Sequence, residues 1–119
     1  MEYERGLGLA REKHYEEAAS VFMGLLNTSP PEGLESNCHY WIGECYYGMR
    51  QYREALPHFE QVLGYQQTSK KDDAQLMIAN CYKRVGDKEH ARQEYQKLID
   101  QYPASPYVQR ARDELAKMP

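Results

Sequence analysis

The sequence predicts an all-α fold, a right-handed α-solenoid of three helix pairs followed by a C-terminal capping helix. Two observations predict it. Ala18, Ala55 and Ala91 recur at spacings of 37 and then 36 residues, and other small and aromatic residues keep the same spacings. Within each copy, apolar residues follow the i, i+3, i+4, i+7 spacing of an amphipathic helix on both sides of a short turn. Such a period is typical of stacked helical repeats that share one continuous core.

Each copy has further fixed points besides the alanine. An aromatic residue follows the alanine by four positions, and a small residue precedes it by twelve. These points are Phe22, Phe59 and Tyr95, and Gly6, Gly43 and Ala79. Small residues allow two antiparallel helices to approach closely, and aromatic rings fill the space beside that contact. We therefore expect a single domain over residues 1–119, with repeats at approximately 1–32, 33–68 and 69–104.

The elements follow from local signals in chain order. The stretch MEYERGLGLAREK is a short first helix whose two glycines each cost about 1 kcal/mol relative to Ala, so we expect the natural chain to continue upstream. In copy two, HYWIGECYYGMRQYREALPHFEQVL reads as two helices with a turn at GMRQY, and Pro57 lies about one turn from a helix start, where proline is tolerated. In copy three, GD separates DDAQLMIANCYKRV from EHARQEYQKLIDQY.

The last segment predicts a capping helix at 105–117. Ser105 and Pro106 are a cap and first-turn pair, and Val108, Ala111 and Leu115 share one stripe. A terminal helix with a polar outer side would cover the apolar face of the last repeat.

Composition and motifs exclude several classes of function. The formal net charge is −3 with both signs interspersed, which does not suit binding to a phosphate backbone, so we expect no nucleic acid. No apolar run approaches the roughly 18 residues of a spanning helix, and we expect no membrane insertion. The chain has no nucleophile elbow, Gly-rich phosphate loop or HExxH run, so we expect no enzyme and no cofactor.

The cysteines and histidines do not predict a metal site. They show neither C-x-x-C nor H-x-x-x-H spacing, so we expect no metal. Cys38, Cys45 and Cys81 are interpreted as small core residues, since free Cys is among the most buried residue types. Their odd number argues mildly against an oxidising compartment.

The repeat resembles the tetratricopeptide repeat (TPR), whose pattern runs from a first helix through Leu-Gly and Tyr to Ala, Phe and a closing Pro. The resemblance spans nearly the whole chain. Single positions depart from the pattern: His39 and Gln75 stand at the opening Trp position, Lys88 replaces a Tyr, and Gln67 replaces the closing Pro. The resemblance implies a binding groove lined by the first helices of the pairs.

Carried over residue by residue, the implied protein-binding groove has members in all three copies. These are Tyr3, Leu7, Ala10 and Arg11 in copy one, Tyr40, Glu44, Tyr47 and Gly48 in copy two, and Leu76, Asn80, Lys83 and Arg84 in copy three. The middle is aromatic and the far end cationic, which suits an extended or helical segment with apolar and acidic residues. In the alternative interpretation, Tyr40 and Tyr47 only fill the packing between repeats.

Three segments of the chain resemble the C-terminal repeat domain of the Tol-Pal-associated cell division coordinator family. These segments are YWIGECYY, QYREALPHFEQVL and DQYPASPYVQRARDEL. That resemblance implies a periplasmic adaptor of the Gram-negative envelope that binds a TolA-like protein and helps coordinate envelope constriction with wall synthesis. It also implies a monomer for this chain alone, and an oligomer through an N-terminal coiled coil upstream. The alternative is a cytoplasmic TPR scaffold or chaperone-type assembly module that binds a peptide or helix of a partner.

Overall fold

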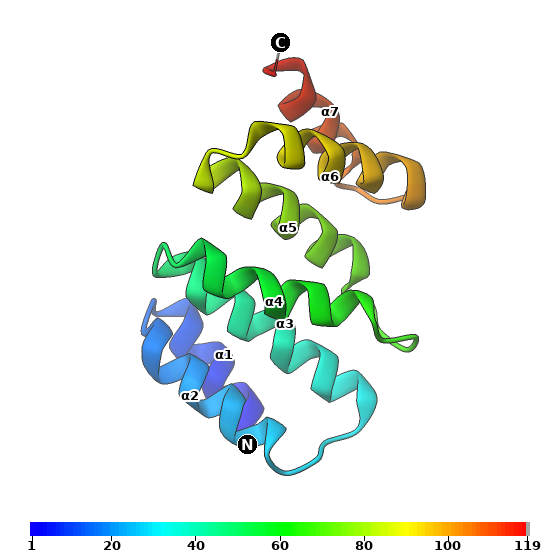
Figure 1. The fold of residues 1–119 in the computed structure, drawn as a ribbon. Helices are drawn as coiled ribbons and strands as arrows, with labels where there is room; N and C mark the ends of the chain where they lie inside the picture. Colours follow the sequence, from blue (N-terminus) through cyan, green and yellow to red (C-terminus); the bar gives the residue numbers. More distant parts are fainter. Residues whose placement is uncertain (119) are drawn as a thin grey trace.

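The computed structural model describes residues 1–118, which form seven α-helices and no strand. The helices are α1 (Glu2–Arg11), α2 (Tyr15–Leu26), α3 (Glu32–Gly48), α4 (Tyr52–Leu63), α5 (Lys71–Val85), α6 (Lys88–Gln101) and α7 (Val108–Ala116). Each helix packs against the next in an elongated stack of 45 × 28 × 20 Å (Figure 1). The predicted α-solenoid of three helix pairs and a terminal helix is confirmed.

The turn inside each helix pair uses the same backbone conformation. Lys13, Arg50 and Gly86 occupy equivalent positions and have φ values of 65°, 62° and 89°. Only glycine adopts this left-handed region without a steric penalty, and Gly86 accordingly ends α5 as its C-cap. The GD turn predicted in copy three is therefore confirmed, and the first two copies form the same turn with less suitable residues.

The two helices of a pair meet at the predicted small residues. A Cβ atom placed on Gly43 would lie 2.7 Å from Cε1 of Phe59, and one placed on Gly6 would lie 2.7 Å from Cζ of Phe22. Neither distance leaves room for a side chain. The prediction that small residues allow close approach beside an aromatic ring is confirmed in the first two pairs.

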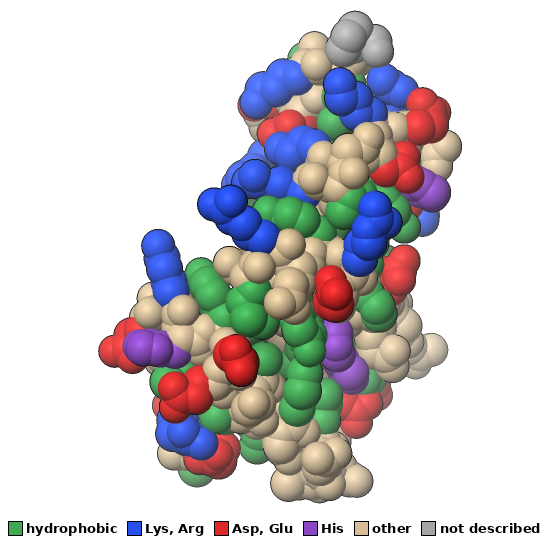
Figure 2. Space-filling model, turned by 60° about the vertical axis from the view of Figure 1, so that its left-hand side comes forward, with side chains coloured by type: hydrophobic (Ala, Val, Ile, Leu, Met, Phe, Trp, Pro, Cys, Tyr) green, Lys and Arg blue, Asp and Glu red, His purple; other side chains and the backbone are tan. Residues whose placement is uncertain are grey.

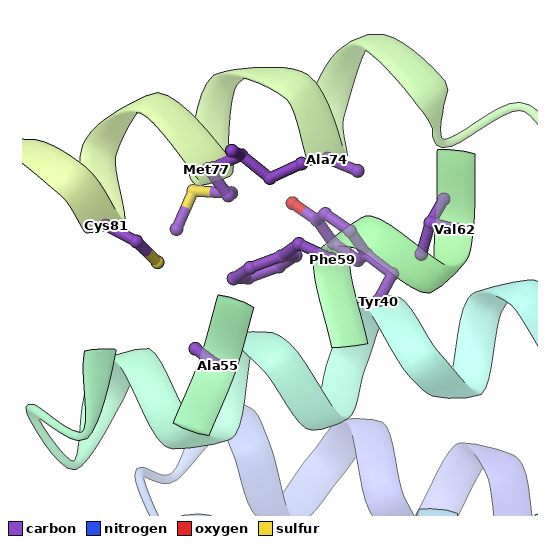
Figure 3. Close-up of a cluster of buried hydrophobic side chains, with 8 residues drawn as sticks. Tyr40, Ala55, Phe59, Val62, Ala74, Met77 and Cys81 are labelled. Atoms are coloured by element: carbon purple, nitrogen blue, oxygen red, sulfur yellow. The ribbon is translucent and has the colours of Figure 1, made fainter. Parts of the chain in front are cut away.

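The core continues from one pair to the next. In the α3–α4–α5 layer, Tyr40 and Phe59 face Met77 and Cys81 from the following pair (Figure 3). A cluster around Phe22 joins α1, α2 and α3, and one around Tyr95 joins α5, α6 and α7. Because each helix pair leaves an apolar face for the next, the stack is stabilised mainly between neighbours.

The terminal helix begins later than predicted. Ser105 Oγ accepts a hydrogen bond from the Tyr107 N–H at 3.1 Å, but this bond closes a turn, and α7 begins at Val108. Ala111 is fully buried, and Val108 and Leu115 pack around it against the last pair, so the predicted stripe is confirmed. Among the helices described in residues 1–118, none combines the length and apolar character required to cross a membrane.

Candidate protein-binding groove

A cavity of about 310 Å³ opens between α1 and α3, the first helices of neighbouring pairs. Its lining residues are Leu7, Ala10, Arg11, Tyr15, Trp41, Glu44, Cys45, Tyr47 and Gly48. The cavity thus brings together six of the twelve residues chosen from the sequence for the groove: Leu7, Ala10, Arg11, Glu44, Tyr47 and Gly48. Its size is at the lower end of ligand-binding cavities, which suits a few side chains of a partner.

Three lining residues were missed by the sequence analysis, namely Tyr15, Trp41 and Cys45. A signal for two of them was present. Trp41, Glu44, Cys45 and Gly48 follow the i, i+3, i+4, i+7 spacing of one helix face, which would have added Trp41 and Cys45 to Glu44. Tyr15 lies at the start of α2 and had no such signal.

Gly48 allows the Tyr15 ring to lie directly against α3 at the edge of the cavity. The Tyr15 ring lies so close to α3 that a Cβ on Gly48 would be 2.5 Å from Tyr15 Cζ. The equivalent residue of the next pair is Arg84, whose Nε donates a hydrogen bond to Tyr47 Oη at 3.1 Å. At the equivalent position of the next pair, a long side chain thus connects α5 to α3.

Glu44 is the acidic group of the cavity, and it is only partly exposed. Its Oε2 accepts a hydrogen bond from Tyr40 Oη at 2.7 Å. Burial raises the pKa of the Glu44 carboxyl. The hydrogen bond from Tyr40 opposes this rise, the negative charge of Asp73 adds to it, and the positive charge of Lys70 opposes it. Burial, followed by the charge of Glu44, also raises the pKa of the Tyr40 hydroxyl, which therefore stays a hydrogen-bond donor at neutral pH.

At the cationic end predicted in copy three, Lys83 forms an ion pair, and the exposed Arg84 lies against Tyr47. Lys83 Nζ lies 3.2 Å from Glu114 Oε1 of the terminal helix, and the Arg84 guanidinium lies 5.9 Å from the centre of the Tyr47 ring. In the face shown in Figure 2, Lys and Arg side chains gather over the upper, C-terminal part of the molecule, and hydrophobic side chains are exposed mainly below them.

The remaining predicted groove residues are packed to different degrees. Leu76 and Asn80 are buried, and Asn80 accepts a hydrogen bond from the Tyr95 hydroxyl in the core. Tyr3 is half-buried, and its ring meets Phe22 edge-on at 5.7 Å. Tyr40 is only 7 % exposed, as the packing interpretation expected of it.

Tyr47 has a different place from Tyr40. It is half-exposed, lines the cavity and packs edge-on against Tyr52 with ring centres 5.0 Å apart. Tyr47 therefore contributes both to packing and to the open surface. Whether it binds a partner stays a prediction.

The cysteines lie in the core. Cys38, Cys45 and Cys81 are free and fully buried, and burial raises their thiol pKa to about 11, about 11 and about 12. The thiols therefore stay protonated at neutral pH. Within residues 1–118, no three His, Cys, Asp or Glu side chains converge as a group able to hold a metal ion.

Comparisons with known proteins agree with this architecture. A family model described as "Tetratricopeptide repeat" matches residues 46–115. Intraflagellar transport protein 70A of Xenopus tropicalis is 36% identical over 62 residues, which are 52% of this chain but only 9% of that protein.

Two solved structures show the same fold. The TPR domain of Arabidopsis FLU is 23% identical, with a TM-score of 0.80 over 87% of this chain and 93% of that one. The second TPR domain of human RPAP3, solved with the HSP70 peptide SGPTIEEVD, is 19% identical, with a TM-score of 0.79 over 98% of this chain and 90% of that one.

Proposed function

Because this chain belongs to the tetratricopeptide repeat family, we propose that it is a protein-interaction module that binds a peptide or helix of a partner protein through the α1–α3 cavity. TPR domains are typically interaction modules, and the similar domain of RPAP3 was solved with a peptide bound. The observation that carries the proposal is the cavity itself, where aromatic, aliphatic and charged side chains from two repeats line one opening. Aromatic residues and Arg are the typical anchors of protein interfaces.

Selection from a displayed random-peptide library on the purified chain tests the proposal. We expect selected peptides to bind the parent chain, and Tyr47→Ala to weaken them by about 1 to 2 kcal/mol, the range of an interface anchor. Gln61→Ala on the exposed side of α4 is the matched control and should change nothing. The proposal is wrong if selected peptides bind both variants as tightly as the parent while circular dichroism shows both variants folded.

The identity of the partner is a separate and more specific proposal. The envelope adaptor of the Tol-Pal system, in the periplasm, is supported by the sequence words YWIGECYY, QYREALPHFEQVL and DQYPASPYVQRARDEL. Titration of the chain with the periplasmic part of a TolA-like protein tests it. Absence of binding, from a chain that still binds selected peptides, would favour the cytoplasmic scaffold or chaperone-type module instead.

A further inference from the structure

We propose that the α1–α3 cavity receives a basic side chain of the partner, Lys or Arg, with an apolar neighbour of that side chain packed against Leu7 and Trp41. The proposal rests on the proposed function and specifies the chemistry of the bound segment. It differs from the expectation drawn from the sequence, which paired Lys83 and Arg84 with acidic residues of a partner.

The first argument is that the Glu44 carboxylate in the cavity forms no ion pair among those described within residues 1–118. Its hydrogen-bond donor there is the neutral Tyr40 hydroxyl. The charge of Lys70 lowers the pKa of the Glu44 carboxyl without forming such a pair, and its effect is the smallest of the four influences on that pKa. A half-buried carboxylate has lost part of its hydration, and a neutral donor replaces only part of it. An ammonium or guanidinium group entering the cavity would supply a charge-assisted hydrogen bond.

The second argument is the state of the cations nearby. Lys83 is paired with Glu114, which offsets its charge, and the exposed Arg84 guanidinium donates to the neutral Tyr47 Oη. Water solvates the Arg84 charge whether or not a partner is bound. Arg11 lines the cavity but is exposed, so water solvates it before and after binding. Glu44 is less exposed than Arg11 and Arg84, so a partner's charge is screened less beside Glu44 than beside either arginine.

The third argument is that the chain already places one cation, Lys70, against the rings of Tyr40 and Trp41 next to Glu44. Lys70 Nζ lies 5.1 Å from the centre of the Tyr40 ring and 5.6 Å from that of Trp41. The two rings stand at 82° to each other, with centres 5.3 Å apart. Cations are attracted to the faces of such rings, so this aromatic surface beside Glu44 favours positive charge.

The apolar residues of the cavity lining indicate which side chain of the partner would lie next to the cation. Leu7 and Ala10 from α1 face the cavity together with Trp41 from α3. An aliphatic or aromatic side chain next to the cation would cover these surfaces and exclude water from the ion pair. Exclusion of water strengthens the attraction between the two charges.

The test repeats the random-peptide selection on three chains: the parent, Glu44→Gln and the control Glu54→Gln. Gln keeps the size of Glu and can still accept from Tyr40, and Glu54 is an exposed residue of α4. We expect Lys or Arg beside an apolar residue to be enriched on the parent and on Glu54→Gln, and this preference to disappear on Glu44→Gln. Thermal melts followed by circular dichroism establish that all three chains are folded.

One selected peptide is then titrated, using the fluorescence of Trp41, the single tryptophan of the chain. Glu44→Gln should weaken binding about tenfold or more, and replacing the basic residue of the peptide by Gln should do the same on the parent chain. Together the two changes should cost little more than either alone, since both remove one interaction. The peptide change does not depend on how well a variant folds.

The outcomes separate this inference from the proposed function. Peptides that lose affinity with Tyr47→Ala but show no basic preference, or an acidic one, would overturn the charge inference and leave the cavity as the binding site. Additive losses from Glu44→Gln and the peptide change would overturn it as well. Peptides indifferent to both Tyr47→Ala and Glu44→Gln would refute the proposed function itself.

Discussion

Substituting alanine for Gly43 should destabilise the domain, although the same change elsewhere in a helix stabilises. The added Cβ would lie 2.7, 2.8 and 2.9 Å from three carbons of the Phe59 ring. Favourable contacts between carbon atoms lie at about 3.5 to 4.0 Å, so ring and helix would have to separate by roughly 0.8 Å. Phe59 is fully buried beside Tyr40 and Ala55, which leaves the ring little room to move.

Two effects of opposite sign decide the magnitude. Overpacking typically costs about 1 to 3 kcal/mol. Against this, replacing glycine by alanine inside a helix contributes about 1 kcal/mol. The expected net loss for Gly43→Ala is therefore about 0 to 2 kcal/mol, a measurable part of the roughly 5 to 15 kcal/mol that stabilise a domain.

Gly8→Ala is the matched control because a Cβ on Gly8 would meet nothing within 4 Å. Gly8 also lies inside a helix, so Gly8→Ala should gain helix propensity without a clash. We expect its free energy of unfolding to rise by up to about 1 kcal/mol. Urea unfolding followed by circular dichroism measures both variants. If the two alanines shift the free energy of unfolding in the same direction by similar amounts, the close contact with Phe59 does not limit packing.

Two further predictions concern the core and the cavity. Ala55→Leu should lower the free energy of unfolding by about 1 to 3 kcal/mol, because Ala55 is fully buried; a melting temperature equal to that of the parent would contradict the helix register. Glu44→Gln should reduce the pH dependence of the free energy of unfolding. Burial raises the folded-state pKa of Glu44, so the stabilisation from its protonation is complete below the unfolded-state pKa. That stabilisation is lost as pH rises through the folded-state pKa. Urea midpoints between about pH 4 and pH 7 should fall less for the variant than for the parent, and parallel curves would refute this.

The repeat pattern was sufficient to predict the fold because its fixed points encode local contacts. A glycine or alanine twelve positions before an alanine, and an aromatic residue four positions after it, specify which faces of two antiparallel helices touch. The contact between Gly43 and Phe59 shows this at atomic distance. The start of α7 was placed too early because the hydrogen bond from Tyr107 to Ser105 closes a turn before the helix begins.

The cavity could not be predicted in the same way, because transferring groove positions from a family treats all repeats as equivalent. The contacts at one lining position differ between repeats: Gly48 lies against the Tyr15 ring, and the equivalent Arg84 donates a hydrogen bond to Tyr47. Likewise, the free charge of Lys83 was overestimated because Glu114 comes from the terminal helix, far along the chain. Such pairings between distant segments have no signal in helical periodicity.

The middle repeat differs from the third at two equivalent positions, and this difference places a carboxylate at the cavity. In copy three, the Tyr95 hydroxyl donates to Asn80, so the polar side chain at this position is used inside the repeat. In copy two the equivalent residues are Phe59 and Glu44, and a phenyl ring offers no such donor. Glu44 instead accepts from Tyr40 on its own helix and lines the cavity. Copy three thus has a buried hydrogen bond between Tyr95 and Asn80, whereas copy two has Phe59 and Glu44 at these positions. The Glu44 carboxylate therefore lines the cavity, where we propose that it binds a cation of a partner.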